Sequence, residues 1–543
     1  MNNIKEIIKK MSLEEKAGQL IASGFNGTKE LTPTIKRALE NGHIGTIMFH
    51  CTSNFRTALQ IKDLSLKIQN TALKSRLKTP AFIAADQEGG QLAVIFRDVN
   101  IHPGNMALAA ISKDADKYCY KAGEYTAKEL KTLGININLA PVLDLALDEG
   151  LPVKDNRYFG SNPGRTGILG SAMINGIQKN GVIACAKHFP GQRNVNIDSH
   201  FKLDIIETPK EILIKRELLP FKKAIKNGVE MIMSIHAAYP AIEPDKNLPA
   251  TLSHSILTGL LRKEFGFNGI IITDDIQMKP IADTYGVDNA IIMSLQAGVD
   301  IILSSNEEYD AYKIITDAVK KNILAEELID NSVYRILKAK KKYISLDWDD
   351  KDTTFSILNN ADAKIFVKEA ARKSITLYKN KVIKYPLHIK ENEHLAIIRP
   401  PFVRLVMSDN TNLFEFTFKD IFKGYVSGVS EHIYGIQPVE DEILSIMDHA
   451  VIADYVLFCT YNAYQYNNQI KALNDICKFI NPDRIIIAVL RSPADIRVIP
   501  EKLNSVWLTY GITKPSIVSL AECLFGSVKP EGKLPVNVDN YEI

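Results

Sequence analysis

Short apolar runs rich in β-branched residues alternate with longer amphipathic segments through nearly the first two thirds of the chain. Seven such runs occupy residues 45–49, 81–86, 135–141, 182–188, 231–237, 269–275 and 300–304. The segments between them repeat apolar residues at helical spacing, as in residues 122–133, 212–226 and 252–265. Strands that are apolar throughout and separated by helices indicate a parallel sheet with both faces covered. About eight such units favour an α/β fold of the (β/α)8 TIM-like barrel type, although only seven strands are evident.

Polar residues gather at the carboxyl ends of these runs. Barrel enzymes keep their active sites at that end of the barrel, so these side chains are expected to lie close together. The residues are Asp86, Asp144, Lys187, His188, His236, Asp274 and Asp275.

A second domain is expected after the barrel, because 543 residues are too many for one ordinary core. Further apolar runs at 394–399, 455–460, 484–490 and 505–510 alternate with helical patterns such as residues 467–480. This pattern indicates a smaller α/β domain of the αβα sandwich type. The acidic, polar segment 345–354 is typical of an exposed boundary. We therefore expect a barrel domain over 1–345, a linker over 346–369 and the second domain over 370–543.

Composition excludes several classes of protein. Apolar residues at 46% and charged residues at 24% are typical of a soluble globular chain, and a net charge of +3 excludes a nucleic-acid-binding signature. The amino terminus has helical spacing, with a capping box at Ser12 and Glu15, rather than a signal peptide, and no stretch reaches membrane-span length. Six scattered cysteines without a C-x-x-C pair indicate reduced thiols and no metal site. We predict a cytoplasmic protein; its oligomeric state stays open.

The stretch 187–200, K-H-F-P-G-Q-R-N-V-N-I-D-S-H, carries one candidate constellation. Pro190 and Gly191 interrupt the preceding strand, so a loop is expected beyond them. Asp198 and His200 lie two residues apart, a spacing that points both side chains the same way in an extended chain. The carboxylate would then orient the imidazole and raise its pKa, producing a proton carrier. The alternative is a solvated loop with an ordinary histidine.

Asp274 and Asp275 close another apolar strand and form the second constellation. Adjacent residues on a strand point to opposite faces, so we expect Asp274 to face the site and Asp275 to cap the following helix. A carboxylate on one strand and a carboxylate-backed histidine on another suit glycoside cleavage, where one group attacks the anomeric carbon and the other protonates the leaving oxygen.

These motifs resemble glycoside hydrolase family 3, in the bacterial β-N-acetylglucosaminidase branch. The family signature is similar to K-H-F-P-G-H-G followed by D-S-H, with the spacing that separates Lys187 from Asp198 here. Similar blocks extend over nearly the whole chain: M-S-L-E-E-K-A-G-Q-L, D-Q-E-G-G, L-A-P-V-L-D, P-A-T-L-S, I-T-D-D-I-Q-M, K-S-I-T-L-Y-K-N and P-E-G-K-L-P-V.

The resemblance implies a role for each matching residue. Asp274 would be the nucleophile, His200 the acid/base and Asp198 its partner. The positions that would bind the sugar are Asp86, Arg157, Lys187, His188, His236 and Met278. From the residues alone, alternatives remain open: a surface lysine at 187, a salt bridge from Arg157 to Asp155, a structural histidine at 236 and a core methionine at 278.

The chain also departs from the family pattern. Gln192 and Arg193 stand where the family has His and Gly, and Gln91 and Val94 stand where it carries arginines. Since valine cannot replace an arginine contact, the sugar or its leaving group is expected to differ from the standard substrate. A neutral histidine base would not repel phosphate as a carboxylate does, so phosphorolysis is a further hypothesis.

The function expected from the sequence is that of a retaining exo-β-N-acetylglucosaminidase in cell-wall recycling, acting on small soluble carbohydrates without metal or cofactor. One alternative is a related family 3 exo-β-glycosidase or phosphorolytic enzyme with a modified sugar. The other is a non-catalytic sugar-binding homologue, which retention of Asp198, His200 and Asp274 disfavours.

Overall fold

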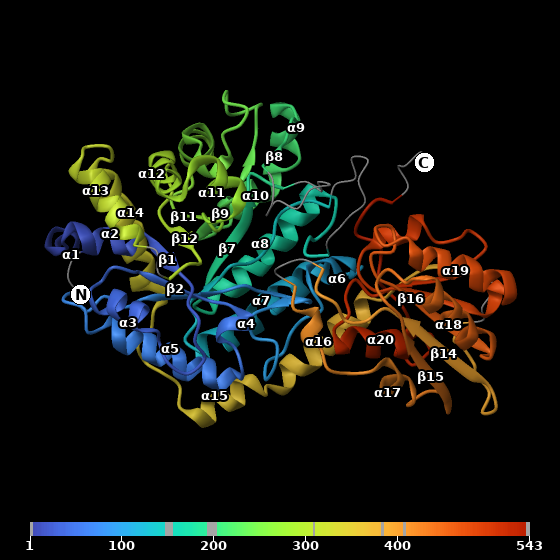
Figure 1. The fold of residues 1–543 in the computed structure, drawn as a ribbon. Coiled ribbons are helices and arrows are strands. Elements are labelled where there is room, and N and C mark those ends of the chain that lie inside the picture. The colour runs from blue at the N-terminus through green and yellow to red at the C-terminus, as the bar shows by residue number, and fades with distance from the viewer. Residues whose placement is uncertain are drawn as a thin grey trace.

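The computed structural model describes residues 4–146, 156–192, 203–307, 310–381, 385–405 and 409–538. A parallel barrel forms one half of the molecule and a smaller α/β domain the other (Figure 1). The barrel sheet has the order β11-β9-β7-β6-β3-β2-β1-β12, and a parallel bridge between Ile272 and Ile301 closes it. The predicted eight-stranded barrel is therefore confirmed.

The barrel strand missing from the sequence prediction is the first one, β1 (Ile21–Ser23). It has three residues and directly follows a helix whose pattern extends into it, so no apolar run marks it. Its partners are β2 and β12. The other barrel strands are β2 (Thr46–Phe49), β3 (Phe82–Ala85), β6 (Ile137–Asn138), β7 (Ile183–Phe189), β9 (Met231–Ser234), β11 (Ile270–Thr273) and β12 (Ile302–Ser304).

Helices cover the outside of the barrel. Ser12 and Glu15 form the predicted capping box at the start of α2. The expected helix at 212–226 is divided in two near Arg216, and that at 252–265 is a wide π-type helix over Ser255–Glu264. The helices of this half are α1 (Ile4–Lys10), α2 (Leu13–Gln19), α3 (Pro33–Glu40), α4 (Cys51–Asn54), α5 (Ala58–Ala72), α6 (Asn105–Ala110), α7 (Ala115–Thr132), α8 (Pro163–Lys179), α9 (Lys210–Lys215), α10 (Leu218–Lys226), α11 (Lys279–Tyr285), α12 (Val287–Ala297), α13 (Ala311–Lys320) and α14 (Glu326–Tyr343).

Two further helices, α15 (Lys351–Leu358) and α16 (Ala361–Ser374), connect the two halves (Figure 1). The acidic segment before α15 is largely exposed, as expected, yet it is attached to the barrel. Thr132 donates to Asp349 Oδ2 at 2.7 Å, and the Lys62 ammonium donates to the Asp349 carbonyl. The exact domain boundary stays a prediction.

The second domain is a six-stranded sheet with the order β13-β18-β17-β16-β14-β15. All neighbours are parallel except β13 and β18. Its strands are β13 (Thr376–Asn380), β14 (His394–Arg399), β15 (Gly428–Ile433), β16 (Tyr455–Thr460), β17 (Ile485–Val489) and β18 (Ser505–Leu508); its helices are α17 (Phe418–Phe422), α18 (Glu440–Val451), α19 (Asn468–Phe479) and α20 (Lys514–Leu524). Apolar clusters lie on both faces of the sheet, which confirms the predicted α/β sandwich.

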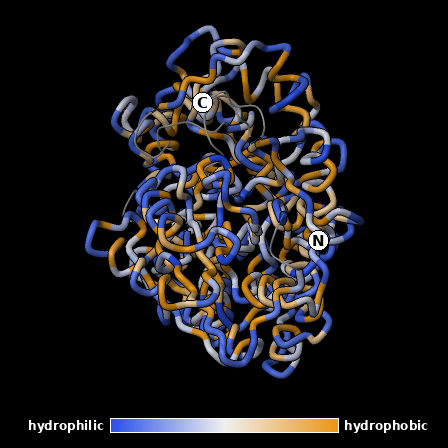
Figure 2. The backbone as a smooth tube through the Cα atoms, turned by 90° about the vertical axis from the view of Figure 1, so that its right-hand side faces the viewer, coloured by the Kyte–Doolittle hydropathy of each residue, from blue (hydrophilic) through white to orange (hydrophobic). Residues whose placement is uncertain are grey.

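The two halves share buried surface. Met106 and Tyr158 of the barrel belong to the same apolar cluster as Ile398 of the second domain. Asn156 Nδ2 donates to the Tyr510 carbonyl at 2.5 Å across the boundary. The most outlying loops are mostly hydrophilic (Figure 2). Within the described ranges, every helix is too short or too polar to cross a membrane.

Candidate active site

A cavity of about 590 Å³ lies at the carboxyl ends of the barrel strands. Seven predicted residues line it, two within β7 and five in segments that follow barrel strands: Asp86, Arg157, Lys187, His188, His236, Asp274 and Met278. The barrel therefore brings these scattered positions together. Asp198 and His200, as well as Arg193, lie outside the residues that the structure describes.

A buried ion cluster forms part of the cavity floor. Lys187 Nζ lies 2.6 Å from Asp86 Oδ1 and 2.7 Å from Glu88 Oε1. Arg157 donates to both oxygens of Glu88, at 2.8 Å from Nε and 2.7 Å from Nη2. Lys187 is only 3% exposed, so the surface-lysine alternative is wrong. The alternative partner of Arg157, Asp155, lies outside the described ranges.

The charges of this cluster support one another. Burial alone would raise the pKa of Glu88, but Arg157 and Lys187 outweigh it and lower that pKa to about 2. Burial likewise disfavours the charge of Lys187, yet Asp86 and Glu88 raise its pKa above the ordinary value. Glu88 and Lys187 are thus both charged at neutral pH. The Asp86 side chain is 24% exposed, so it is the carboxylate of this cluster that meets a ligand in the cavity.

Asp144 positions His188 beside the cluster. The buried Asp144 carboxylate lies 2.7 Å from His188 Nδ1 and also accepts the backbone N–H of His188 at 3.1 Å. Because the Asp144 carboxylate accepts a hydrogen bond, the imidazole proton of His188 lies on Nδ1. The other ring nitrogen, Nε2, can then contact a ligand in the cavity. Asp144 Oδ1, which accepts the backbone N–H of His188, also accepts the N–H of Gln192 at 2.8 Å.

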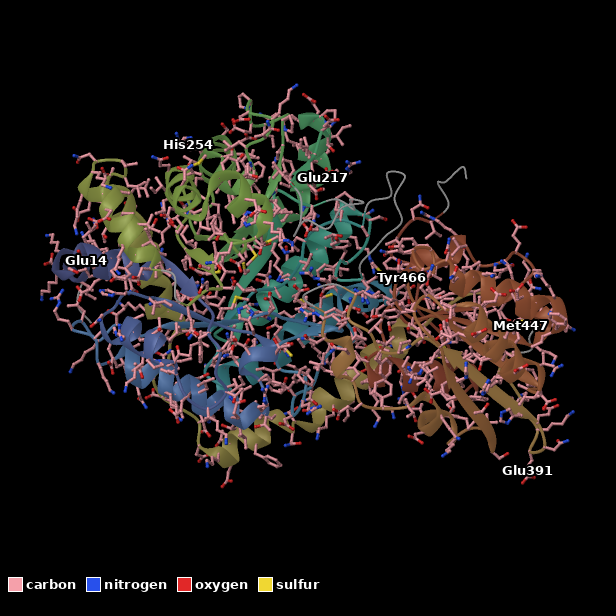
Figure 3. The ribbon with its side chains drawn as sticks, viewed as in Figure 1. Glu14, Glu217, His254, Glu391, Met447 and Tyr466 are labelled. Atoms are coloured by element: carbon pink, nitrogen blue, oxygen red, sulfur yellow. The ribbon has the colours of Figure 1, made fainter. Side chains whose placement is uncertain are left out.

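Pro190 and Gly191 end β7 as predicted, and several contacts hold the turn that follows. Gly191 has a φ of +124°, which favours glycine, and a Cβ there would lie 3.0 Å from the Cβ of Glu217. Glu217 lies between α9 and α10 (Figure 3). The Tyr239 hydroxyl donates to the Gly191 carbonyl at 2.9 Å. The start of the segment that leads to Asp198 and His200 is therefore fixed in place.

Asp274 lies at the carboxyl end of β11, on the cavity. Its Oδ1 accepts the N–H of Asp275 at 2.8 Å. Burial would raise its pKa, but the neighbouring His188 and His236, together with the Asp275 N–H, lower it below the ordinary value. Asp274 is therefore an ionised carboxylate at neutral pH, in a wall otherwise rich in donors.

Asp275 has a local role. Its Oδ1 accepts the N–H of Gln277 at 3.0 Å, which closes a turn. The helix α11 starts two residues later and has no side-chain cap at Met278. The prediction of a local hydrogen bond is confirmed, but the prediction of a helix cap is wrong, because the turn separates Asp275 from the helix.

His236 is held by the protein through both ring nitrogens. Nε2 lies 3.0 Å from the Asp275 carbonyl, which can only accept, so this nitrogen carries a proton. Nδ1 lies 3.0 Å from Thr251 Oγ1. Burial lowers the pKa of His236, opposed by the charge of Asp274. These contacts fix a rigid imidazole in the cavity wall. Met278 also lines the cavity and is half-buried, so it does not lie in a closed core.

The second domain supplies part of the cavity wall through Arg404 and Asn410. The backbone N–H of Asn410 donates to the Gln91 carbonyl at 2.9 Å, and its Nδ2 donates to the Ala93 carbonyl at 2.6 Å. Val94, which replaces a family arginine, is 5% exposed and lines the cavity nearby. One of the two segments that depart from the family pattern, around Gln91 and Val94, is thus in contact with the second domain.

Glu88, Arg404 and Asn410 were not predicted from the sequence, and Asp144 was expected at the strand ends but was given no role. Glu88 and Asp144 belong to the motifs D-Q-E-G-G and L-A-P-V-L-D, which resemble family blocks. Their position near the end of a strand is the sequence feature that indicates a place at the site. Arg404 and Asn410 carry no such signal, because only the packing of the second domain places them at the barrel.

Comparison with known proteins identifies the family. The family model described as "Glycosyl hydrolase family 3 N terminal domain" matches residues 12–339 of this chain. The chain belongs to glycosyl hydrolase family 3. A solved family 3 β-N-acetylglucosaminidase from Paenibacillus sp. str. FPU-7 is 31% identical to this family 3 chain, with a TM-score of 0.89, over 97% of this chain and 99% of that one.

Two curated relatives support the same family assignment. Beta-hexosaminidase A of Pseudoalteromonas piscicida is 28% identical over 94% of this chain and 92% of its own length. The beta-hexosaminidase of Nitrosomonas eutropha is 31% identical over 53% of this chain and 80% of its own length. As a family 3 member, the protein is a glycoside hydrolase, and the predicted recognition is confirmed.

Proposed function

We propose that this family 3 protein is a retaining exo-acting β-N-acetylglucosaminidase that removes terminal β-linked N-acetylglucosamine from small glycosides. The observation that carries the proposal is Asp274, an ionised carboxylate in the cavity wall beside two histidines and the charged floor. The names of the similar proteins, β-N-acetylglucosaminidase and beta-hexosaminidase, support this substrate class.

The floor would orient the sugar. Asp86 accepts hydrogen bonds from hydroxyls, and the Lys187 ammonium and His188 Nε2 face the same space. Charged donors and acceptors in a largely buried setting give strong orientation, because each interaction is short and directional. A floor built on the buried Lys187 and Glu88 suits a terminal sugar that enters from the open side of the cavity.

Asp274 would attack the anomeric carbon. In the first displacement a bond forms between a carboxylate oxygen and that carbon while the bond to the leaving oxygen breaks. We assign protonation of the leaving oxygen to His200, backed by Asp198. Water then attacks the glycosyl ester, His200 takes its proton, and Asp274 leaves as a carboxylate. Two inversions retain the configuration. A cytoplasmic site of action stays a prediction, supported by the six unpaired cysteines.

The decisive experiment is hydrolysis of an aryl β-N-acetylglucosaminide, with the anomeric configuration of the product followed by NMR. We expect aryl release with a β-configured initial product, and a slow fluorinated substrate should leave a covalent label on the peptide that contains Asp274. An α-configured product, or a label on another peptide, would contradict the mechanism. Parallel assays with and without phosphate distinguish hydrolysis from phosphorolysis by release of sugar 1-phosphate.

A further inference from the structure

A second cavity, of about 570 Å³, lies at the boundary between the barrel and the second domain. We call it the interdomain cavity; it is lined from residues 96–101 of the barrel, 364–368 of α16, and 413–416 and 513–518 of the second domain. Helix α16, which connects the two halves, packs against α20 (Figure 1). None of the described residues lines both this cavity and the one at the barrel strand ends. Its volume is within the range of about 300–1,000 Å³ that is usual for small-molecule sites.

The wall of the interdomain cavity includes three phenylalanines. Phe96, Phe414 and Phe416 are half-buried and line it. The rings of Phe414 and Phe416 pack on Phe402, with centroids 6.2 Å and 5.0 Å from that ring. The ring of Phe96 packs on Phe55, with 4.8 Å between centroids. Each ring is thus supported by a neighbour and still lines the cavity, so the wall offers fixed aromatic surface to an aromatic ligand.

The charged residues that line the interdomain cavity are mostly cations. They are Arg97, Lys364, Lys368 and Lys514, against one carboxylate, Glu415. Arg97 and Glu415 pair with each other at 2.6 Å. Three exposed lysines therefore remain beside an aromatic wall.

Protein carboxylates leave most of this lysine charge uncompensated. Lys364 Nζ donates to a neutral side-chain amide at 3.2 Å. Lys368 Nζ lies 3.4 Å from Glu522, whose two oxygens already accept from Arg372. Within the described ranges, no carboxylate pairs with Lys514. An anion in the cavity would meet ammonium groups that are ready to pair with it.

The polar side chains of the wall are engaged by the protein itself. The backbone N–H of Asn100 donates to Glu129 Oε1 at 3.0 Å, and Asn100 Nδ2 donates to the Leu358 carbonyl at 3.0 Å. On α20, the Thr513 and Ser516 hydroxyl oxygens lie 2.8 Å apart. Recognition of a ligand therefore falls to the aromatic wall and the lysines.

We propose that the interdomain cavity binds a small aromatic molecule that carries one carboxylate. The phenylalanine rings would contact its aromatic part and the lysines its carboxylate, so a neutral aromatic or a bare anion would make only one of the two contacts. Because both halves of the protein line the cavity, the bound molecule would stabilise their docked arrangement. This site goes beyond the proposed glycosidase activity and does not depend on it.

The test uses 2-naphthoate and its neutral amide, 2-naphthamide, as probes of the full chain in titration calorimetry. We expect 2-naphthoate to bind with a Kd on the order of 0.1 mM, and 2-naphthamide and acetate to bind more weakly by at least about 3-fold. Saturating 2-naphthoate should raise the thermal unfolding midpoint by about 1–2 °C, because the ligand binds the folded protein.

Two variants locate the binding. K514A should weaken 2-naphthoate about 3-fold and leave 2-naphthamide unchanged. Val518 is half-buried on α20, and V518W should fill the cavity and remove binding of both probes. The matched control is K529A, because Lys529 is an exposed lysine beyond the end of α20 that does not line the cavity. K514A changes only an exposed side chain, so it tests the site even where V518W unfolds.

Three results would overturn the proposal: no binding of 2-naphthoate to the wild type, undiminished binding to folded V518W, or the same loss in K529A as in K514A. The activity of the barrel is a separate question. Wild-type protein that binds 2-naphthoate but cleaves no β-N-acetylglucosaminide would contradict the proposed function and leave the interdomain site intact.

Discussion

The floor and the mouth of the cavity are built in opposite ways. The floor consists of buried groups near the ends of barrel strands, each engaged by a neighbour, as in the pairs of Lys187 with Glu88 and His188 with Asp144. The mouth is the outer part of the cavity, where the exposed side chains of Lys279, at the start of α11, and Arg404, in the second domain, line it. Under the proposed function, the floor orients the terminal sugar, Asp274 in the wall reacts with it, and the mouth faces the rest of the substrate.

The difference in burial sets what each region tolerates. A buried charge that loses its partner cannot regain water, so floor residues depend on one another. An exposed cation is screened by solvent and salt, so a mouth residue adjusts affinity by small factors. Substitutions at the two ends should therefore differ in size, in the property affected and in their response to salt.

The largest effect is expected for D274N. The amide preserves the shape and the hydrogen bond from the Asp275 N–H but cannot form the glycosyl ester, so kcat should fall by more than about 10³-fold. Steady-state kinetics measures the loss, and the thermal unfolding midpoint should stay within a few degrees of wild type. D275N serves as a neighbour with a structural role, and substantial residual activity of D274N would place the nucleophile elsewhere.

E88Q should damage the floor by leaving Arg157 and Lys187 incompletely compensated. Breaking a buried ionic cluster costs about 3–5 kcal/mol, so denaturant unfolding should show a loss of that order. The folded pKa of Glu88 is lowered to about 2 from an ordinary 4.5. Its contribution to stability is therefore complete above pH 4.5 and is lost as the pH falls through 2.

The pH dependence offers a sharper version of the same test. E88Q should lose less stability than wild type when the pH falls from 4.5 towards 2, because glutamine has no proton to take up. Parallel unfolding curves at both pH values measure this difference. Identical pH profiles for the two proteins would show that Glu88 is not the depressed carboxyl.

D144N should have an intermediate effect. Asparagine retains the shape but presents an amide to His188 Nδ1, so the orientation and proton position of the imidazole are no longer enforced. We expect kcat/KM to fall about 10- to 100-fold with a smaller change in stability. An unchanged kcat/KM would mean that His188 does not act on the substrate through Nε2.

N410A should have the smallest effect of this series. It removes the hydrogen bond from Nδ2 to the Ala93 carbonyl but leaves the backbone contact to Gln91. The cost should be about 1 kcal/mol of stability, with KM raised severalfold and kcat little changed. A fall in kcat/KM as large as that expected for D144N would contradict the separation between floor and mouth.

Most of the barrel and its site could be predicted because both depend on local patterns. Apolar runs identify buried parallel strands, and residues at their carboxyl ends must converge once the barrel closes, as Asp86, Lys187 and Asp274 do. The first strand, Ile21–Ser23, was not predicted, because three residues are too few to show a pattern of apolar residues. The strand Gly428–Ile433 was not predicted, because it lies at the edge of its sheet and has a mixed burial pattern.

The sequence by itself therefore determined the architecture, the family and the acids that end the barrel strands. Only the tertiary structure decided which charges pair and what forms the outer wall. Glu88 joins Arg157 and Lys187, far apart in the chain, and Arg404 reaches the cavity through the docking of a separate domain. The physical reason is range: periodicity and capping act over a few residues, whereas ion pairs and domain contacts depend on distances that only the complete fold sets.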